Sequence, residues 1–97
     1  MLKIKCVFSA ALTPINEDCS INLISYLSHC EWLLKQNLSG LGIFGTTGEA
    51  NCFNIQEKSQ ALEFLIDNNI SPNFLVPGTG QCSIIDTVKF TKKCSSL

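Results

Sequence analysis

The chain alternates between short apolar runs and longer stretches in which apolar and polar residues are mixed. Each short run is almost wholly apolar, which predicts a strand covered on both faces. Each longer stretch repeats its apolar residues at helical spacing, which is typical of a helix with one buried face. The predicted strands are residues 4–12, 41–44 and 74–76, and the predicted helices are residues 22–36, 54–66 and 83–94. Three strands that each precede a helix predict an α/β fold with a parallel sheet in one unit.

Capping residues mark the ends of the predicted helices. Asn22, Asn54 and Ser83 stand where each helix should begin, and their side chains can accept a hydrogen bond from the first turn. Asn37 and Gly40 tolerate a left-handed backbone and are expected to end the first helix. The predicted buried faces are Leu23, Leu27, Cys30 and Leu34, with Ile24, Trp32 and Leu33 beside them, then Ala61, Leu62, Leu65 and Ile66, and last Ile84, Ile85, Val88 and Phe90.

Composition narrows the class of protein. The chain has 97 residues, is 45% hydrophobic and carries a net charge of −1, which is typical of a globular protein and not of a disordered tail. Its seven basic residues are scattered, which argues against nucleic acid as a partner. The sequence shows neither a signal peptide nor an apolar run of membrane length, so we expect a cytoplasmic protein that does not contact a membrane.

Six cysteines and one histidine raise the question of a metal site. No two cysteines have the spacing of a C-x-x-C ligand pair, and His29 lies inside a predicted helix with no partner at zinc-ligand spacing. We therefore expect reduced thiols that pack as small core hydrophobic side chains, and no metal.

The turn after the second predicted strand holds the most informative residues. Gly45 and Gly48 lack a Cβ, which lets the backbone turn sharply and approach a ligand. Between them, Thr46 and Thr47 add hydroxyls that can donate to a carboxylate or phosphate, and adjacent backbone N–H groups can form an anion-binding concavity. The carboxyl ends of strands are where α/β folds bind ligands. A plain strand-to-helix turn without a ligand is the alternative.

Neighbouring patterns favour structural roles. Residues 40–45 spell G-x-G-x-x-G, but the strand lies inside this pattern and a helix precedes it, which is the reverse of a dinucleotide-binding site. Glu49 is a candidate general base, although an acid at such a turn more often accepts hydrogen bonds from backbone N–H groups, which is the role we favour. The seven lysines, Lys58 among them, fall at chain ends or on polar helix faces, so none is a convincing Schiff-base residue.

Three motifs occur at the same point of the strand–helix pattern. They are Ala11-Leu12-Thr13-Pro14 after the first strand, Gly45-Thr46-Thr47-Gly48-Glu49 after the second and Gly78-Thr79-Gly80 after the third. In this order and spacing they resemble the dihydrodipicolinate synthase / N-acetylneuraminate lyase family of pyruvate-dependent class I aldolases. The resemblance implies that residues 1–97 are the first three βα units, an N-terminal fragment of a single (β/α)8-barrel domain that takes roughly 250 residues when complete.

The resemblance also implies a reaction. A lysine on a later strand would form a Schiff base with pyruvate, so no metal or organic cofactor is needed, and the fragment alone is expected to be inactive. Thr46 and Thr47 would hold the pyruvate carboxylate, and Thr46 would also belong to a proton relay. The residues expected to support this site are Gly45, Gly48, Glu49 and Thr13. The substrates would be pyruvate and an aldehyde, most like those of 4-hydroxy-tetrahydrodipicolinate synthase, and the assembly would be a homotetramer.

Some residues depart from the family pattern. Ile55 and Lys58 stand where lysine-inhibited synthases have histidines, and Cys82 replaces a polar residue, which argues against feedback inhibition by lysine. Two interpretations besides an active lyase remain at this point. One is a small flavodoxin-like module whose glycine turns hold a phosphate, and the other is an inactive, degenerate member of the family.

Overall fold

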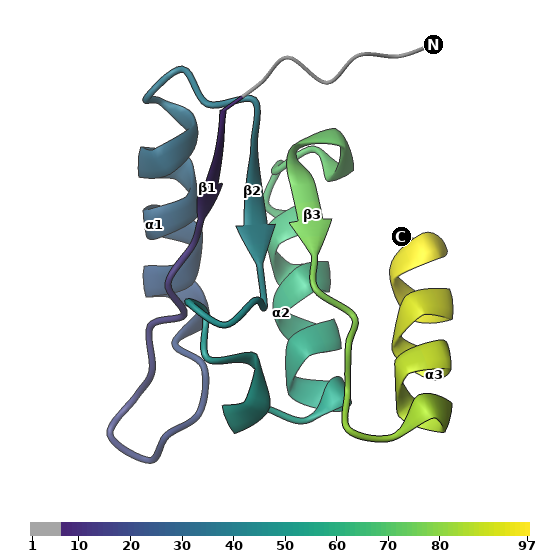
Figure 1. The fold of residues 1–97 in the computed structure, drawn as a ribbon. Helices are drawn as coiled ribbons and strands as arrows, with labels where there is room; N and C mark the ends of the chain where they lie inside the picture. The colour runs from purple at the N-terminus through teal and green to yellow at the C-terminus, as the bar shows by residue number, and fades with distance from the viewer. Residues whose placement is uncertain (1–6) are drawn as a thin grey trace, which may run out of the picture.

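The described part of the chain contains three parallel strands and three α-helices, as predicted (Figure 1). The computed structural model describes residues 7–97. The strands are β1 (Phe8–Ala10), β2 (Gly40–Ile43) and β3 (Leu75–Pro77), and the helices are α1 (Leu23–Leu34), α2 (Ile55–Asp67) and α3 (Ile84–Ser95), with short 3-10 helices at Ala50–Cys52 and Pro72–Phe74. Each element begins or ends within a few residues of its predicted position. Part of the first predicted strand, residues 4–6, lies outside the described residues.

The strand order distinguishes a flavodoxin-like module from the first part of a (β/α)8 barrel. The sheet has the order β1-β2-β3, with both pairs parallel. In a flavodoxin-like fold the first strand lies between the second and the third. Here β2 occupies the centre, so the flavodoxin-like alternative is wrong. Sequential order is the arrangement of strands in a (β/α)8 barrel.

Each predicted N-cap is confirmed. The side chains of Asn22, Asn54 and Ser83 accept a hydrogen bond from the backbone N–H three residues further on, at 3.0, 2.8 and 3.3 Å. Asn37, which lies shortly after the end of α1, adopts a left-handed backbone with φ 63°, as expected of a residue that stops a helix. The role expected of Gly40 is wrong, because Gly40 begins β2. A Cβ at Gly40 would lie 2.6 Å from the Phe8 ring and 2.9 Å from the Phe74 carbonyl oxygen, so close packing requires the glycine.

The helices cover only one face of the sheet (Figure 1). Leu41 and Ile43 of β2 point into the core that lies between the sheet and the helices, and both are buried. The opposite face carries the row Ala10, Gly42 and Val76, in which Val76 is 54% exposed. The prediction of strands covered on both faces is therefore wrong for the described residues.

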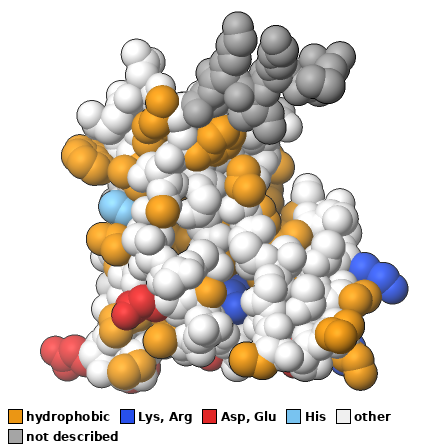
Figure 2. All heavy atoms as spheres, viewed as in Figure 1, with side chains coloured by type: hydrophobic (Ala, Val, Ile, Leu, Met, Phe, Trp, Pro, Cys, Tyr) orange, Lys and Arg blue, Asp and Glu red, His pale blue; other side chains and the backbone are white. Residues whose placement is uncertain are grey.

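Some residues predicted to be buried lie at the surface instead. In α1 the innermost residues are Tyr26 and Cys30, whereas Ile24 and Trp32 are exposed. The face of α2 agrees with the prediction. In α3 only Phe90 is buried, and the hydrophobic residues on its outer side are exposed (Figure 2). These are Ile84, Ile85 and Val88. Periodicity marks an apolar stripe, but only a neighbouring element can cover it.

The cysteines follow the prediction only in part. The five cysteines among the described residues form no disulfide. Cys30 is buried as a core hydrophobic side chain, but Cys19, Cys52 and Cys82 are exposed, because they lie in the connections between the strands and the α-helices. Cys6 lies outside the described residues.

Lys58 is the largest departure from the predicted surface. The residue is 1% exposed, and its Nζ lies 5.5 Å from the centre of the Phe90 ring. The packing of α3 against α2 covers the position that an isolated α2 would present to solvent, and an ion pair between Lys93 and Glu63 also joins these helices. Burial lowers the pKa of Lys58 because the charged amine loses its hydration. The ring offsets part of this cost through a cation–π contact.

We expect the substitution Lys58→Met to raise the free energy of unfolding by about 1 kcal/mol at neutral pH, because it removes a buried charge that forms no ion pair with another described residue. The folded pKa is lowered, so the unfolded chain binds more protons and the stability of the wild type rises with pH up to the ordinary value of 10.5. The advantage of the variant should therefore shrink as the pH rises through that window. Urea unfolding at several pH values measures both effects, and Lys89→Met, at an exposed position of α3, is the control. Equal effects of the two substitutions would contradict this account.

Candidate functional site

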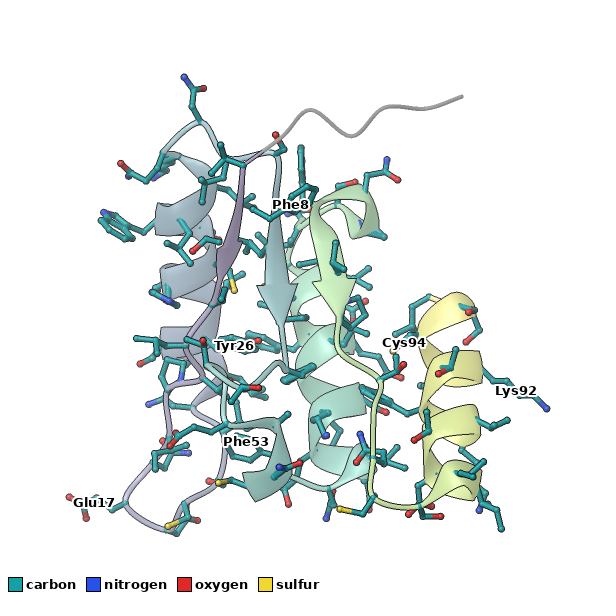
Figure 3. All side chains as sticks on the ribbon, viewed as in Figure 1. Phe8, Glu17, Tyr26, Phe53, Lys92 and Cys94 are labelled. Atoms are coloured by element: carbon teal, nitrogen blue, oxygen red, sulfur yellow. The ribbon has the colours of Figure 1, made fainter. Side chains whose placement is uncertain are left out.

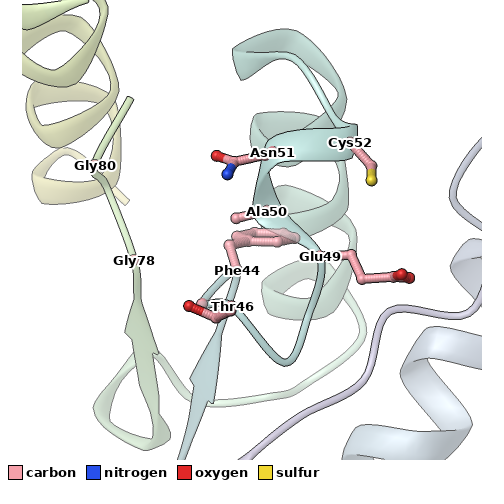
Figure 4. A pocket seen from close by; sticks show the side chains of 9 residues that line it. Phe44, Thr46, Glu49, Ala50, Asn51, Cys52, Gly78 and Gly80 are labelled. Carbon is pink, nitrogen blue, oxygen red and sulfur yellow. The ribbon is translucent and has the colours of Figure 1, made fainter. Parts of the chain in front are cut away.

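The candidate site lies where β2 ends, at the carboxyl edge of the sheet. Residues 44–49 form a turn that leads from β2 into the 3-10 helix Ala50–Cys52. Thr46 and Thr47 lie at the exposed tip of this turn. Neither hydroxyl makes a hydrogen bond to another described residue, so both can donate to a ligand. Figure 4 shows the Thr46 hydroxyl pointing toward the segment around Gly78.

The sharp bends of the turn do not fall on the glycines. Phe44 and Glu49 adopt the left-handed backbone, with φ 56° and 54°, whereas none of the described glycines has a positive φ. The expectation that Gly45 and Gly48 supply the bends is therefore wrong. Gly48 serves another purpose, because a Cβ there would lie 3.1 Å from the Ala11 carbonyl oxygen and 3.3 Å from the Phe44 nitrogen. Gly48 thus allows the turn to pack against the segment that follows β1.

Aromatic packing holds Phe44 in its unfavourable conformation. A left-handed backbone at a bulky residue costs on the order of 1–3 kcal/mol and persists only where the surroundings enforce it. The Phe44 side chain is 2% exposed, and its ring lies 6.0 Å from Tyr26 and 6.4 Å from Phe90, measured between ring centres. Burial of such a side chain stabilises the fold by a comparable amount, about 2 kcal/mol. Because Phe44 points into the core, the residues after it turn toward solvent.

Thr13 connects the segment after β1 to the turn. Its Oγ1 donates a hydrogen bond to the Gly48 carbonyl oxygen at 2.8 Å, and Thr13 itself is buried. A buried hydroxyl that donates to a backbone carbonyl fixes both partners. Thr13 therefore lies where a residue that supports the turn should lie.

Glu49 does not act as the sequence suggested. Its carboxylate makes no capping hydrogen bond and points away from the Thr46 hydroxyl (Figure 4). The prediction that this carboxylate accepts hydrogen bonds from backbone N–H groups is wrong. The left-handed backbone of Glu49 turns its side chain outward, and its backbone holds the turn instead. The Glu49 N–H donates to the Thr46 carbonyl oxygen at 3.1 Å, and the Glu49 carbonyl oxygen accepts from Cys52 at 2.9 Å.

Two hollows meet at the turn. One, of about 410 Å³, lies between the turn and the segment after β3, and Phe44, Asn51 and Gly80 are among its lining residues. The other, of about 360 Å³, lies on the open face of the sheet and includes Thr47. Gly45, Thr46 and Gly78 line both. None of the lysines in residues 7–97 lines either hollow.

The segment after β3 packs directly against the turn. The Gly78 N–H donates to the Ile43 carbonyl oxygen at 2.8 Å, and a Cβ at Gly78 would lie 2.6 Å from the Phe44 carbonyl oxygen. Asn51 also lines the first hollow, although it was not among the residues predicted for the site, and Figure 4 shows its amide directed toward the segment of Gly78 and Gly80. An amide two residues after a glycine turn is the signal that could have revealed it.

The part of the chain that the structure describes shows neither a metal site nor a membrane-spanning helix. Residues 7–97 contain no group of three or more His, Cys, Asp or Glu side chains that could hold a metal. None of the described helices is both long enough and apolar enough to cross a membrane. His29 stacks on Trp32 within α1, with 6.5 Å between the ring centres.

The model of the dihydrodipicolinate synthetase family matches residues 3–97. The chain belongs to this family. A 4-hydroxy-tetrahydrodipicolinate synthase from Listeria monocytogenes EGD-e is 32% identical over 95 residues, which cover 94% of this chain and 31% of the relative. The enzyme of the same name from Coxiella burnetii RSA 493 is 28% identical, over 91% of this chain and 30% of the relative.

Solved structures of the dihydrodipicolinate synthetase family show the same fold. Dihydrodipicolinate synthase from Agrobacterium tumefaciens matches with a TM-score of 0.85 and 28% identity, over 92% of this chain and 31% of that one. The chloride-inhibited synthase from Acinetobacter baumannii, complexed with pyruvate, matches with a TM-score of 0.82 and 27% identity, over 97% and 32%. The family resemblance and the fold class, the first three βα units of a (β/α)8 barrel, are thereby confirmed. The chain spans less than a third of the length of these relatives.

We expect Gly78→Ala to lower the free energy of unfolding by about 2 kcal/mol, because the new Cβ would collide with the backbone of Phe44. Gly45→Ala is the matched control, because a Cβ at Gly45 meets no atom within 4 Å. Urea unfolding of both variants measures the difference. Equal stability of the two would show that the segment after β3 does not pack tightly on the turn.

Proposed function

We propose that this chain is the N-terminal part of a (β/α)8-barrel lyase in which Thr46 and Thr47 hold the carboxylate of pyruvate. The observation that carries the proposal is the pair of exposed hydroxyls at the carboxyl end of β2, neither of which is bonded to another described residue. Hydroxyl groups and neighbouring backbone N–H groups are suitable donors for a carboxylate. The pyruvate bound in the Acinetobacter baumannii relative supports a small keto acid as the ligand class.

Fixing the carboxylate would prepare the keto carbon for reaction. A lysine amine would add to that carbon and expel water, which forms an iminium ion. Loss of a proton from the methyl group then gives an enamine that attacks an aldehyde and forms the carbon–carbon bond. Thr46 is proposed to move a proton in this sequence as well as to bind. The nitrogen cation serves as the electron sink, so the proposal needs no metal or organic cofactor.

The lysine nucleophile would come from a part of the protein beyond residue 97. No described lysine lines the two hollows beside Thr46, and Lys58 lies beside Phe90, where α2 packs against α3. The curated relatives favour an activity most like that of 4-hydroxy-tetrahydrodipicolinate synthase, with pyruvate and an aldehyde as substrates. We further propose a cytoplasmic homotetramer as the working form of the full-length protein.

In the full-length protein, we expect Thr46→Val to lower kcat/KM for pyruvate by about 100-fold, because valine keeps the shape of threonine but removes the hydroxyl at the reacting centre. Ser39→Ala, which removes a hydroxyl just before β2, should leave kcat/KM within about twofold of the wild type. A steady-state assay of both variants tests the role of Thr46. Similar losses in the two variants would count against it.

Borohydride trapping tests the position of the nucleophile. Reduction of an iminium by borohydride locks pyruvate onto the lysine as a stable amine, which mass spectrometry detects. We expect the full-length protein to be labelled and the 97-residue chain to remain unlabelled. A pyruvate adduct on the 97-residue chain would overturn the assignment of the nucleophile to a later strand.

A further inference from the structure

Gly42 is a glycine that neither its backbone nor its packing among the described residues requires. It lies in β2 and is paired with Ala10 on one side and with Val76 on the other. None of the described glycines has a positive φ, so this position is open to other residues. Apart from its chain neighbours, a Cβ at Gly42 would meet only the Ser9 carbonyl oxygen, at 3.8 Å, which is an ordinary contact. A glycine inside a strand costs stability relative to alanine, so its presence needs another explanation.

Gly40, two residues earlier on the same face of β2, has a clear structural role. A Cβ there would lie 2.6 Å from the Phe8 ring, so this ring lies over the glycine. Figure 3 shows Phe8 near the ends at which the strands begin. The space over Gly40 is therefore filled. The space over Gly42, one row closer to the carboxyl edge of the sheet, is open among the described residues.

The space over Gly42 belongs to a hollow that reaches the two threonines. Gly42, Thr46 and Thr47 all line the hollow of about 360 Å³. A molecule whose carboxylate is held by the threonine hydroxyls can therefore extend over Gly42. Ala10 and Val76, which line the hollow on either side of Gly42, have apolar side chains. The part of a ligand that lies there should be apolar as well.

We propose that Gly42 sets the size of the keto acid that the site accepts. The hollow over it admits a 2-keto acid with a longer alkyl chain, such as 2-oxobutanoate, as well as pyruvate. This inference rests on the proposed function, because it places the carboxylate at Thr46 and Thr47. In 2-oxobutanoate a methyl group replaces one methyl hydrogen of pyruvate, so the carbon next to the keto group still has a proton to lose. The iminium of the longer acid can therefore form the enamine by the same steps.

Competition between the two keto acids tests the role of Gly42 in the full-length protein. An equimolar mixture of pyruvate and 2-oxobutanoate is trapped with borohydride, and mass spectrometry separates the two adducts, which differ by one methylene group. We expect the wild type to carry both adducts. Gly42→Ala should lower the ratio of the 2-oxobutanoate adduct to the pyruvate adduct by about tenfold, because its Cβ takes the space of the extra carbon. Ser39→Ala, which does not line the hollow, should keep the wild-type ratio.

Urea unfolding without a keto acid shows whether another part of the protein fills the hollow. We expect the unfolding midpoint of Gly42→Ala to be at least as high as that of the wild type, and that of Gly40→Ala to be lower. A lowered midpoint for Gly42→Ala would overturn the inference, as would an unchanged adduct ratio or a wild type that carries the pyruvate adduct alone. In these three cases labelling by pyruvate would still support the proposed function. A wild type that neither acid labels would refute the proposed function, and this inference with it.

Discussion

The burial of Phe44 is the interaction on which the site depends. The chain leaves β2 at Ile43 and must reverse direction within a few residues, and it does so by placing a bulky residue in a left-handed conformation. Packing between the rings of Tyr26 and Phe90 offsets the cost of that conformation. Because the Phe44 side chain is buried in the core, the next three residues, 45–47, are exposed at the carboxyl edge of the sheet. The exposure of Thr46 and Thr47 is therefore a consequence of core packing rather than of loop flexibility.

Local sequence rules account for most of the elements. The caps Asn22, Asn54 and Ser83 each satisfy a backbone N–H of their own helix, so their effect does not depend on the rest of the fold. The parallel order of the strands likewise follows from the alternation of strands with helices. Burial is a different matter. Lys58 was predicted at the surface but is buried, and Ile84 was predicted to be buried but is exposed. The position of α3 decides which of these side chains are covered, and the periodicity of the sequence carries no information on that position.

In the candidate site, too, some features could be predicted from the local sequence and others depend on the assembled fold. Thr46 and Thr47 could be identified from the sequence because two hydroxyls after an apolar run are a chemical signal in themselves. The outward direction of the Glu49 carboxylate and the contact of Gly78 with Phe44 depend on backbone angles and on segments far apart in the chain. The packing of Tyr26 on Phe44 has the same origin, since it requires α1 and the turn to be assembled first.

The sequential strand order has a consequence for synthesis on the ribosome. Each new strand pairs with the strand made just before it, so every βα unit can dock on its predecessor as soon as it emerges. Among the described residues the outer edge of β3 pairs with no strand, and backbone N–H and C=O groups at such an edge can pair with a further strand. A sheet built in this order grows by one edge at a time, and the turn that presents Thr46 and Thr47 can take its shape as soon as β1, α1 and β2 have docked.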